Sequence, residues 1–150
     1  MQQGILENMR AWLQTAPGFE RVKTLYLDYA DLPGTAGLWP TGVQEVSRQY
    51  NVLGAAKARC RCTFVLRLLL PFAPGADDTA AENARFVLAL QQWMAAQSAQ
   101  GLAPKFGAEP GERLWGSGGK MEAAEDEGYA KYTITITAEY TTKMEETDEN

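Results

Sequence analysis

Apolar and polar residues alternate strictly over the last long patterned stretch of the chain, YTITITAEYT. Apolar side chains occupy the even positions from Tyr132 to Tyr140, and threonines with one glutamate occupy the odd positions from Thr133 to Thr141. Successive side chains of a β-strand point to opposite faces of a sheet. The pattern therefore predicts a strand with one apolar face for a core and one hydroxyl-rich face whose partner has to be explained.

A second alternating stretch predicts a β-hairpin in the middle of the chain. We expect a first arm from Val46 to Tyr50, a turn at NVLG, and a long second arm from Lys57 to Leu70. One side of the long arm is apolar and the other is mainly polar and basic. Shorter strands are expected at Thr24–Tyr29, around Ala36–Pro40 and around Arg113–Gly116, with the rest of the segment between Leu102 and Gly128 mostly loop.

Two segments have helical spacing. The first, ILENMRAWL, repeats apolar residues every three or four positions and ends at Ala16-Pro17-Gly18. The second opens with a capping box formed by Thr79 and Glu82, with Asp77-Asp78 as favourable charge at its N-terminus, and ends at Gly101. Its predicted buried stripe consists of Phe86, Ala89, Leu90, Trp93 and Ala96.

The order of these elements, a helix, strands, a helix and strands again, lacks the strict alternation of a parallel doubly wound sheet. We expect an α+β fold with a mainly antiparallel sheet and two helices packed on one face. A length of 150 residues with 45% hydrophobic content is typical of one domain with one core, spanning residues 1–150. Residues 142–150, which end in a run of acids, are expected to form a disordered tail.

Charge and hydropathy narrow the functional classes. The net charge of −5 argues against the broad basic surface of a nucleic-acid-binding protein, so no specific binding of nucleic acid is expected. No apolar stretch approaches the roughly 20 residues of a membrane span, and the N-terminus lacks the pattern of a signal peptide. We therefore expect no membrane partner and a cytoplasmic location at synthesis.

Candidate chemistry is sparse. Because the chain has no histidine, catalytic triads that use imidazole and zinc sites with histidine ligands are excluded. The GSGGK stretch at Gly116–Lys120 lacks the first glycine and the final Ser or Thr of a phosphate-binding loop, which favours a mobile hairpin loop instead. Cys60 and Cys62 are expected to be free thiols of the core. We expect no catalytic residues, no metal and no cofactor.

Two charged clusters have a functional and a plain interpretation. The acids at Glu122 and Glu125–Glu127 could hold a cation or act as an acid and base, but a flexible, solvated segment is favoured. Basic residues gather in the hairpin of an otherwise acidic protein: Arg48, Lys57, Arg59, Arg61 and Arg67. They form either a solvated sheet face or a docking face for an acidic partner, which includes another copy of the chain.

The order and pattern of these elements resemble a known family over most of the chain. The resemblance rests on MRAWLQTAPGF, GLWPTGVQEVSRQYNVLGAAKARCRCTFVLRLL, NARFVLALQQWMAAQSAQGLAPKF and GYAKYTITITAEY. These stretches are similar to small prophage proteins of Gram-positive bacteria known as minor capsid proteins, which are related to the tail terminators of long-tailed phages. The segment GAEPGERLWGSGGKMEAAEDEG departs from that family because it is longer and more acidic.

The resemblance implies a structural virion protein rather than an enzyme. Tail terminators form a ring, usually of six copies, that caps the tail tube and joins it to the head and neck. The implied partners are other copies of the chain, the tail-tube protein and a head or neck completion protein, and the implied locations are the host cytoplasm during assembly and then the virion tail. We expect an exposed assembly surface on the sheet, formed by Arg59, Arg61, Arg67, Thr133, Thr135 and Thr137.

Other functions stay open at this point. A head-side completion, neck or minor capsid protein shares the size and the ring geometry of a terminator. A small carboxylate-dependent hydrolase would show metal-dependent turnover. A host-derived binding module would show a discrete ligand pocket.

Overall fold

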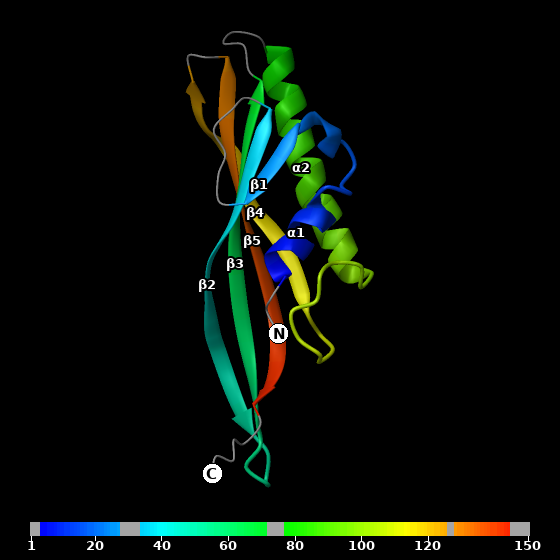
Figure 1. Ribbon diagram of the computed structural model, residues 1–150, viewed down its shortest axis with the longest axis vertical. Helices are drawn as coiled ribbons and strands as arrows, with labels where there is room; N and C mark the ends of the chain where they lie inside the picture. The colour runs from blue at the N-terminus through cyan, green and yellow to red at the C-terminus, as the bar shows by residue number, and fades with distance from the viewer. Residues whose placement is uncertain (1–3, 28–33, 72–76, 126–127, 145–150) are drawn as a thin grey trace.

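A computed structural model describes residues 4–27, 34–71, 77–125 and 128–144. One five-stranded sheet in the order β1-β2-β3-β5-β4 runs the length of the molecule (Figure 1). The strands are β1 (Thr24–Leu27), β2 (Thr35–Tyr50), β3 (Ala56–Pro71), β4 (Arg113–Glu125) and β5 (Tyr129–Met144). Only β1 and β2 are parallel among these pairs, and the other three pairs are antiparallel.

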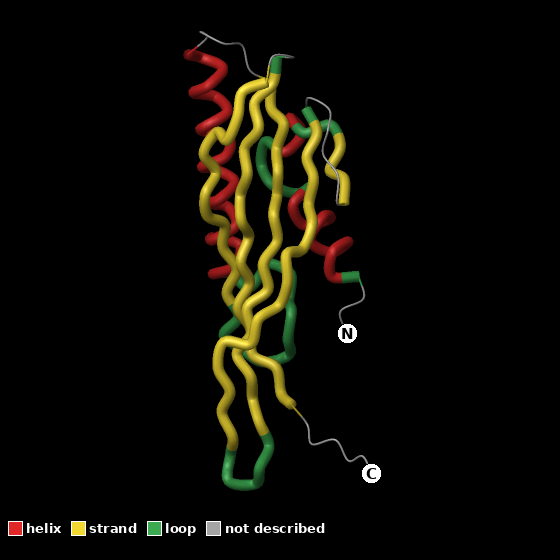
Figure 2. Tube along the Cα trace, turned by 90° about the vertical axis from the view of Figure 1, so that its left-hand side faces the viewer, coloured by secondary structure: helices red, strands yellow, loops and turns green. Residues whose placement is uncertain are grey.

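Helices α1 (Ile5–Leu13) and α2 (Asp77–Ala99) lie on the same face of this sheet, as the side view in Figure 2 shows. A short 3-10 helix, η1 (Phe19–Arg21), links α1 to β1. The expected α+β fold, with a mainly antiparallel sheet, is confirmed. No helix within the described ranges is long and apolar enough to span a membrane.

The core lies between the sheet and the two helices. Alternate residues of β3 and β5 point into it, so the apolar faces predicted from the sequence are buried: Ala58, Cys60, Cys62, Phe64, Leu66, Leu68 and Leu70 in β3, and Tyr132, Ile134, Ile136, Ala138 and Tyr140 in β5. The two helices contact each other through the stacked rings of Trp12 and Trp93, whose centroids lie 4.7 Å apart. Trp12 Nε1 also donates a hydrogen bond to Gln97 Oε1 at 3.0 Å.

The buried face of helix α2 differs in part from the predicted one. It begins at Asp77, so Thr79 lies inside the first turn and is not the N-cap of a capping box. Val87 and Met94 are buried, whereas Ala89 and Ala96, which were expected in the core, are exposed. The cause is the glycine-rich strand β4 beneath the helix, since a Cβ at Gly116 would lie 3.0 Å from Met94 Sδ and one at Gly119 would lie 2.7 Å from Val87 Cγ1.

The same close packing explains the GSGGK stretch. It is not a hairpin loop but part of β4, which continues to Glu125 well beyond the expected end at Gly116. Gln91 Nε2 donates to the Gly118 carbonyl at 2.9 Å, which ties the helix to this strand. The glycines therefore bring a helix close to a strand edge, because side chains at these positions would collide with α2.

Strand β2 is also longer than expected, since it joins the two predicted pieces into one strand. Register shifts between Pro40 and Gly42 and between Glu45 and Ser47 mark two β-bulges that keep β2 paired with β3 along its length. At the far end of the molecule, β5 extends to Met144, so residues 142–144 belong to a strand and not to the expected tail. Residues 145–150 of that expected tail lie outside the described ranges, as does Tyr29 of the first predicted strand.

Candidate assembly surfaces

The face of the sheet that turns away from the helices, called the open face below, carries the six residues predicted as an assembly surface. The side chains of Arg59, Arg61 and Arg67 are 28%, 39% and 33% exposed, and Thr133 and Thr135 are half-buried. The prediction is wrong for Thr137, which is only 7% exposed. Its side chain lies in register between Thr63 of β3 and the large ring of Trp115 of β4, two neighbours that the sequence of β5 alone does not reveal.

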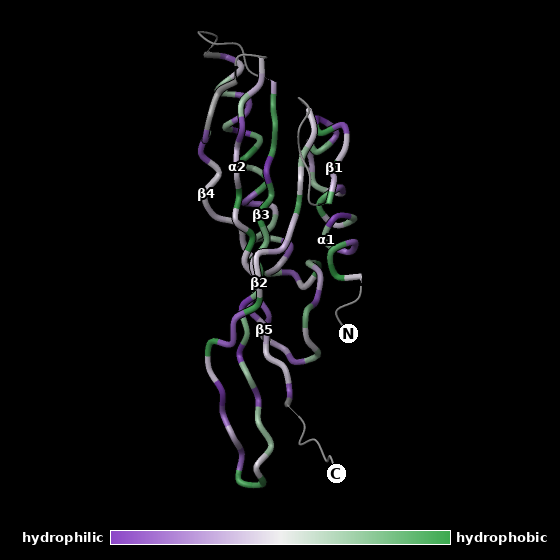
Figure 3. The backbone as a smooth tube through the Cα atoms, turned by 60° about the vertical axis from the view of Figure 1, so that its left-hand side comes forward, coloured by the Kyte–Doolittle hydropathy of each residue, from purple (hydrophilic) through white to green (hydrophobic). Residues whose placement is uncertain are grey.

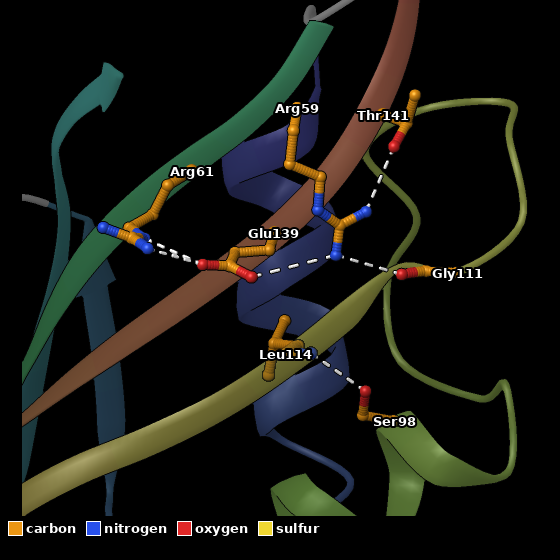
Figure 4. A network of polar contacts seen from close by, with 7 residues as sticks. All are labelled: Arg59, Arg61, Ser98, Gly111, Leu114, Glu139 and Thr141. Carbon is orange, nitrogen blue, oxygen red and sulfur yellow. Dashed lines mark hydrogen bonds and ion pairs between the residues drawn. The ribbon is translucent and has the colours of Figure 1, made fainter. Parts of the chain in front are cut away.

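Two of these arginines share one carboxylate. Arg61 donates to Glu139 Oε2 from Nε at 3.0 Å and from Nη2 at 2.7 Å (Figure 4). Arg59 lies 3.8 Å from the other oxygen of Glu139 and donates to Thr141 Oγ1 and to the Gly111 carbonyl, both at 3.1 Å. Glu139 is therefore the counter-ion that joins β3, β5 and the segment before β4.

The electrostatics of Glu139 follow from this arrangement. Its hydrogen bonds with Arg61 lower the pKa of the carboxyl, and the charges of Arg61, Arg113 and Arg59 act in the same direction against the opposing effect of burial. One carboxylate cannot neutralise all of these cations, so a surplus of positive charge stays on this part of the open face. A surface with such a surplus suits an acidic partner.

Arg67 forms a separate cluster on the open face, farther along β3 than Arg59 and Arg61. Its guanidinium lies 5.3 Å from the centroid of the Trp39 ring and 4.0 Å from Glu122 Oε1. Thr133 donates to the same Glu122 oxygen at 2.9 Å. Glu122, which the sequence placed in a solvated acidic cluster, is thus a partner of the predicted surface residues. Nothing is described for Asp126 and Glu127 of that cluster.

A projecting hairpin carries the longest run of exposed residues in the described part of the chain, and its sequence pattern did not predict it as a surface for association. This arm, residues 40–55, extends past both helices, with hydrophobic colour at its tip (Figure 3). Every residue from Pro40 to Ala55 is exposed. Five of the eight large apolar side chains that are exposed within the described ranges belong to it: Val43 (65%), Val46 (45%), Tyr50 (66%), Val52 (99%) and Leu53 (87%).

The tip of the arm is held by an Asn-centred turn. Asn51 Oδ1 accepts hydrogen bonds from the amides of Leu53 and Ala55 at 2.8 and 3.0 Å. The amide of Asn51 donates to the Ala55 carbonyl at 2.9 Å. This turn keeps Val52 and Leu53 in water, although polar residues are typical of hairpin turns. The two aliphatic residues at the predicted turn are the sequence signal from which this surface could have been predicted.

The arm also presents a strand edge. Strand β1 pairs with β2 only between Thr35 and Leu38. From Pro40 to Tyr50, the pairing described for β2 is with β3 alone. Edge strands expose unpaired backbone groups, and the two bulges and Pro40 limit how a second strand can pair there.

A shallow groove lies at the opposite edge of the sheet, between α2 and β4. It has a volume of about 580 Å³, and small or apolar side chains make up much of its lining: Ala95, Ala99, Leu114 and Trp115. Ser98 fixes the two walls, since its Oγ accepts a hydrogen bond from the Leu114 amide at 2.9 Å. Arg113 covers one end, with its guanidinium 4.4 Å from the centroid of the Trp115 ring.

The segment between α2 and β4 covers part of the core beside this groove. Phe106 stacks on Tyr140 with centroids 5.6 Å apart and contacts Phe64 at 5.9 Å. Glu112 accepts hydrogen bonds from the amides of Phe106 and Gly107 at 2.9 and 2.6 Å. Residues 102–112 form no helix or strand, as expected, and Phe106 anchors this loop to the core.

Cys60 and Cys62 are free thiols of the core, as predicted. Burial raises the pKa of both thiols, and the Glu45 carboxylate adds to the effect at Cys60. Raised thiol pKa values leave little thiolate at neutral pH, so both side chains act as small apolar residues. Across the described part of the chain, no group of three or more His, Cys, Asp and Glu residues is placed to hold a metal ion.

Searches of protein-family models and of curated proteins found no match to this chain.

Proposed function

We propose that this chain is a structural virion protein, a tail terminator that forms a ring on the end of a phage tail tube. The observation that carries the proposal is the projecting arm with its exposed apolar side chains. Exposed apolar side chains that gather on one projecting element favour protein association, because water is released when a partner covers them. A subunit of a larger assembly would cover these side chains with a neighbouring protein.

The distribution of surfaces also supports a ring. A closed ring built from head-to-tail contacts needs two different, complementary patches on each subunit. The arm lies at the β2 edge of the sheet and the groove lies at the β4 edge. The open face, with Arg59, Arg61, Arg67, Thr133 and Thr135, lies between them and is the proposed surface for the tail-tube or neck partner.

Binding and mass measurements test the proposal. Light scattering across a concentration series is expected to detect a ring of six copies, and electron microscopy is expected to show that ring on the ends of purified tail tubes. A ring that binds isolated heads but not tubes would favour a head-side completion or neck protein. A chain that remains monomeric and does not bind tail-tube protein would contradict both functions.

A further inference from the structure

A polar hollow lies on the open face, between the arm and the segment before β4. Its volume is about 360 Å³, and Glu109 and Pro110 of that segment complete its lining. Two neighbouring rows across β2, β3 and β5 meet at this hollow: Gln49, Lys57 and Lys143 in one row, and Ser47, Arg59 and Thr141 in the next. Every side chain of the two rows is polar, so the hollow suits a charged or polar group of a partner.

Positive charge dominates the side of the hollow that meets solvent. Lys57 and Lys143 lie directly opposite each other on β3 and β5, and their side chains are 55% and 63% exposed. The acid between them, Glu109, lies at 3.2 and 3.7 Å and keeps only 18% of its side-chain surface in water. One covered carboxylate therefore serves two exposed ammonium groups, as Glu139 does for two arginines nearby.

The two lysines are poorly placed for stability and well placed for binding. Like charges directly opposite each other on neighbouring strands are destabilising. Each ammonium group has three donors, and within the described ranges Lys57 makes one hydrogen bond, to Glu109, whereas Lys143 makes none. By contrast, both terminal nitrogens of Arg59 already donate to acceptors of the protein. The unused donors of this hollow thus belong mainly to the lysines.

We infer that the hollow binds carboxylates of an acidic protein surface, with Lys57 and Lys143 as the contact residues. Charge complementarity identifies the occupant, because exposed cations above covered acids attract a surface rich in Asp and Glu. Ser47 and Gln49 add a hydroxyl and an amide donor on the arm side of the hollow. The inference rests on the proposed function, under which this acidic surface belongs to the tail-tube protein.

A folded protein suits this site better than a nucleic acid does. A phosphate backbone carries negative charge at every nucleotide, so Glu109 and Glu139 oppose it, whereas a protein surface can set neutral or basic groups against them. Base stacking is also hindered, because Trp39 and Trp115 on the open face each have an arginine guanidinium over the ring. The net charge of −5 adds repulsion at longer range.

Variants of altered charge test the site with purified tail tubes as the probe. Lys57→Gln combined with Lys143→Gln is expected to weaken tube binding about tenfold at about 50 mM salt, and the deficit should shrink as salt is added. Lys23→Gln combined with Arg85→Gln is the matched control, since it removes two charges at exposed positions outside the hollow. Glu109→Gln changes the charge in the other direction and is expected to tighten binding, a gain that an unfolded variant cannot produce.

Light scattering on the same preparations separates the site from the function. The lysine variant is expected to keep the mass of the ring while it loses affinity for tubes. Tube binding that is unchanged in the lysine variant, or equally weakened in the matched control, would overturn the inference and leave the ring standing. Lysine-dependent binding of a duplex DNA of about 30 base pairs, with tube binding unchanged, would overturn it in favour of nucleic acid. A wild-type chain that stays monomeric and binds no tubes would overturn the proposed function as well.

Discussion

At the scale of single residues, Glu139 is the acid that pairs with two arginines of the open face. It holds Arg61 by two hydrogen bonds and lies near Arg59, and both arginines lose their counter-ion without it. Exposed ion pairs contribute little to stability, but this carboxylate keeps only 16% of its side-chain surface in water. Water therefore screens this ion pair only partly, so its contribution to the free energy of unfolding should be large enough to measure.

Glu139→Gln is expected to lower the free energy of unfolding by about 1 kcal/mol at pH 7. The folded-state pKa of Glu139 lies below its ordinary value of 4.5, so its contribution is present above that pH and is lost as the pH falls through the lowered value. The difference between wild type and variant should therefore shrink in acid. Urea unfolding from pH 7 to pH 3 measures it, and a difference that grows on acidification would contradict this assignment.

Asn83 is a second residue whose role the sequence did not reveal. It is fully buried, its Nδ2 donates to the Pro71 carbonyl at 2.9 Å, and its Oδ1 accepts from Arg21 Nη2 at 2.7 Å. One polar side chain in α2 thereby joins the end of β3 to η1. From sequence alone, an asparagine in a helix is expected on the solvent side, because only the tertiary structure supplies buried partners.

Asn83→Ala is expected to lower the free energy of unfolding by about 2 kcal/mol, since it leaves the Pro71 carbonyl without its donor. Asn83→Asp keeps an acceptor for Arg21 but sets an oxygen against the Pro71 carbonyl, so it is also expected to lower the free energy of unfolding. Denaturant midpoints at constant m-value report both changes. An effect of Asn83→Ala within the scatter of exposed positions would show that this bridge does not stabilise the fold.

At the scale of elements, strict alternation was the most informative part of the sequence. The faces of β3 and β5 were predicted because each strand has one apolar side against the helices. Strand β2 was split in two because Pro40 and Gly42 interrupt its pattern, and bulges that absorb such interruptions depend on a paired neighbour. Strand β4 was predicted to be too short because its glycine-rich sequence resembles a loop. Only the tertiary structure shows that α2 packs closely on these glycines.

Gly119→Ala tests this packing of α2 on β4. The residue has φ +91°, and a Cβ would lie against Gln91 Nε2 and 2.7 Å from Val87 Cγ1. Backbone strain and this collision together are expected to cost about 2 to 4 kcal/mol of unfolding free energy. Gly128→Ala is the control, since Gly128 has φ +89° with no neighbour within 4 Å, and about 1 kcal/mol is expected there. Equal effects at the two positions would refute the close-packing explanation.

The arm can be tested without disturbing the fold. Val52→Ser combined with Leu53→Ser is expected to change the free energy of unfolding by less than about 0.5 kcal/mol, because both side chains already lie in water. Assembly should weaken, and sedimentation velocity would detect a shift toward monomer. Leu88→Ser, at a 56% exposed position on α2, is the matched control for loss of an exposed leucine. Unchanged assembly of the arm variant would remove the tip from the proposed interface.

At the scale of the whole molecule, the fold is an elongated sheet with helices on one face, an open face and two unlike edges. The sequence predicted the polar side of β3 and β5 that forms the open face, but it was wrong about the exposure of Thr137, because exposure depends on the neighbours across the sheet. It did not predict the arm as a surface, because that surface depends on how far the hairpin extends beyond the helices. These features together favour a subunit of a ring.

Mass in solution tests this central claim most directly. Static light scattering after size-exclusion chromatography, repeated over a wide range of protein concentrations, gives the number of copies of the 16.5 kDa chain in each species. A discrete species of six copies, approached without stable larger polymers, is the result predicted by closed head-to-tail contacts. A chain that stays monomeric at every concentration, or that stops at a two-fold dimer, would contradict the account.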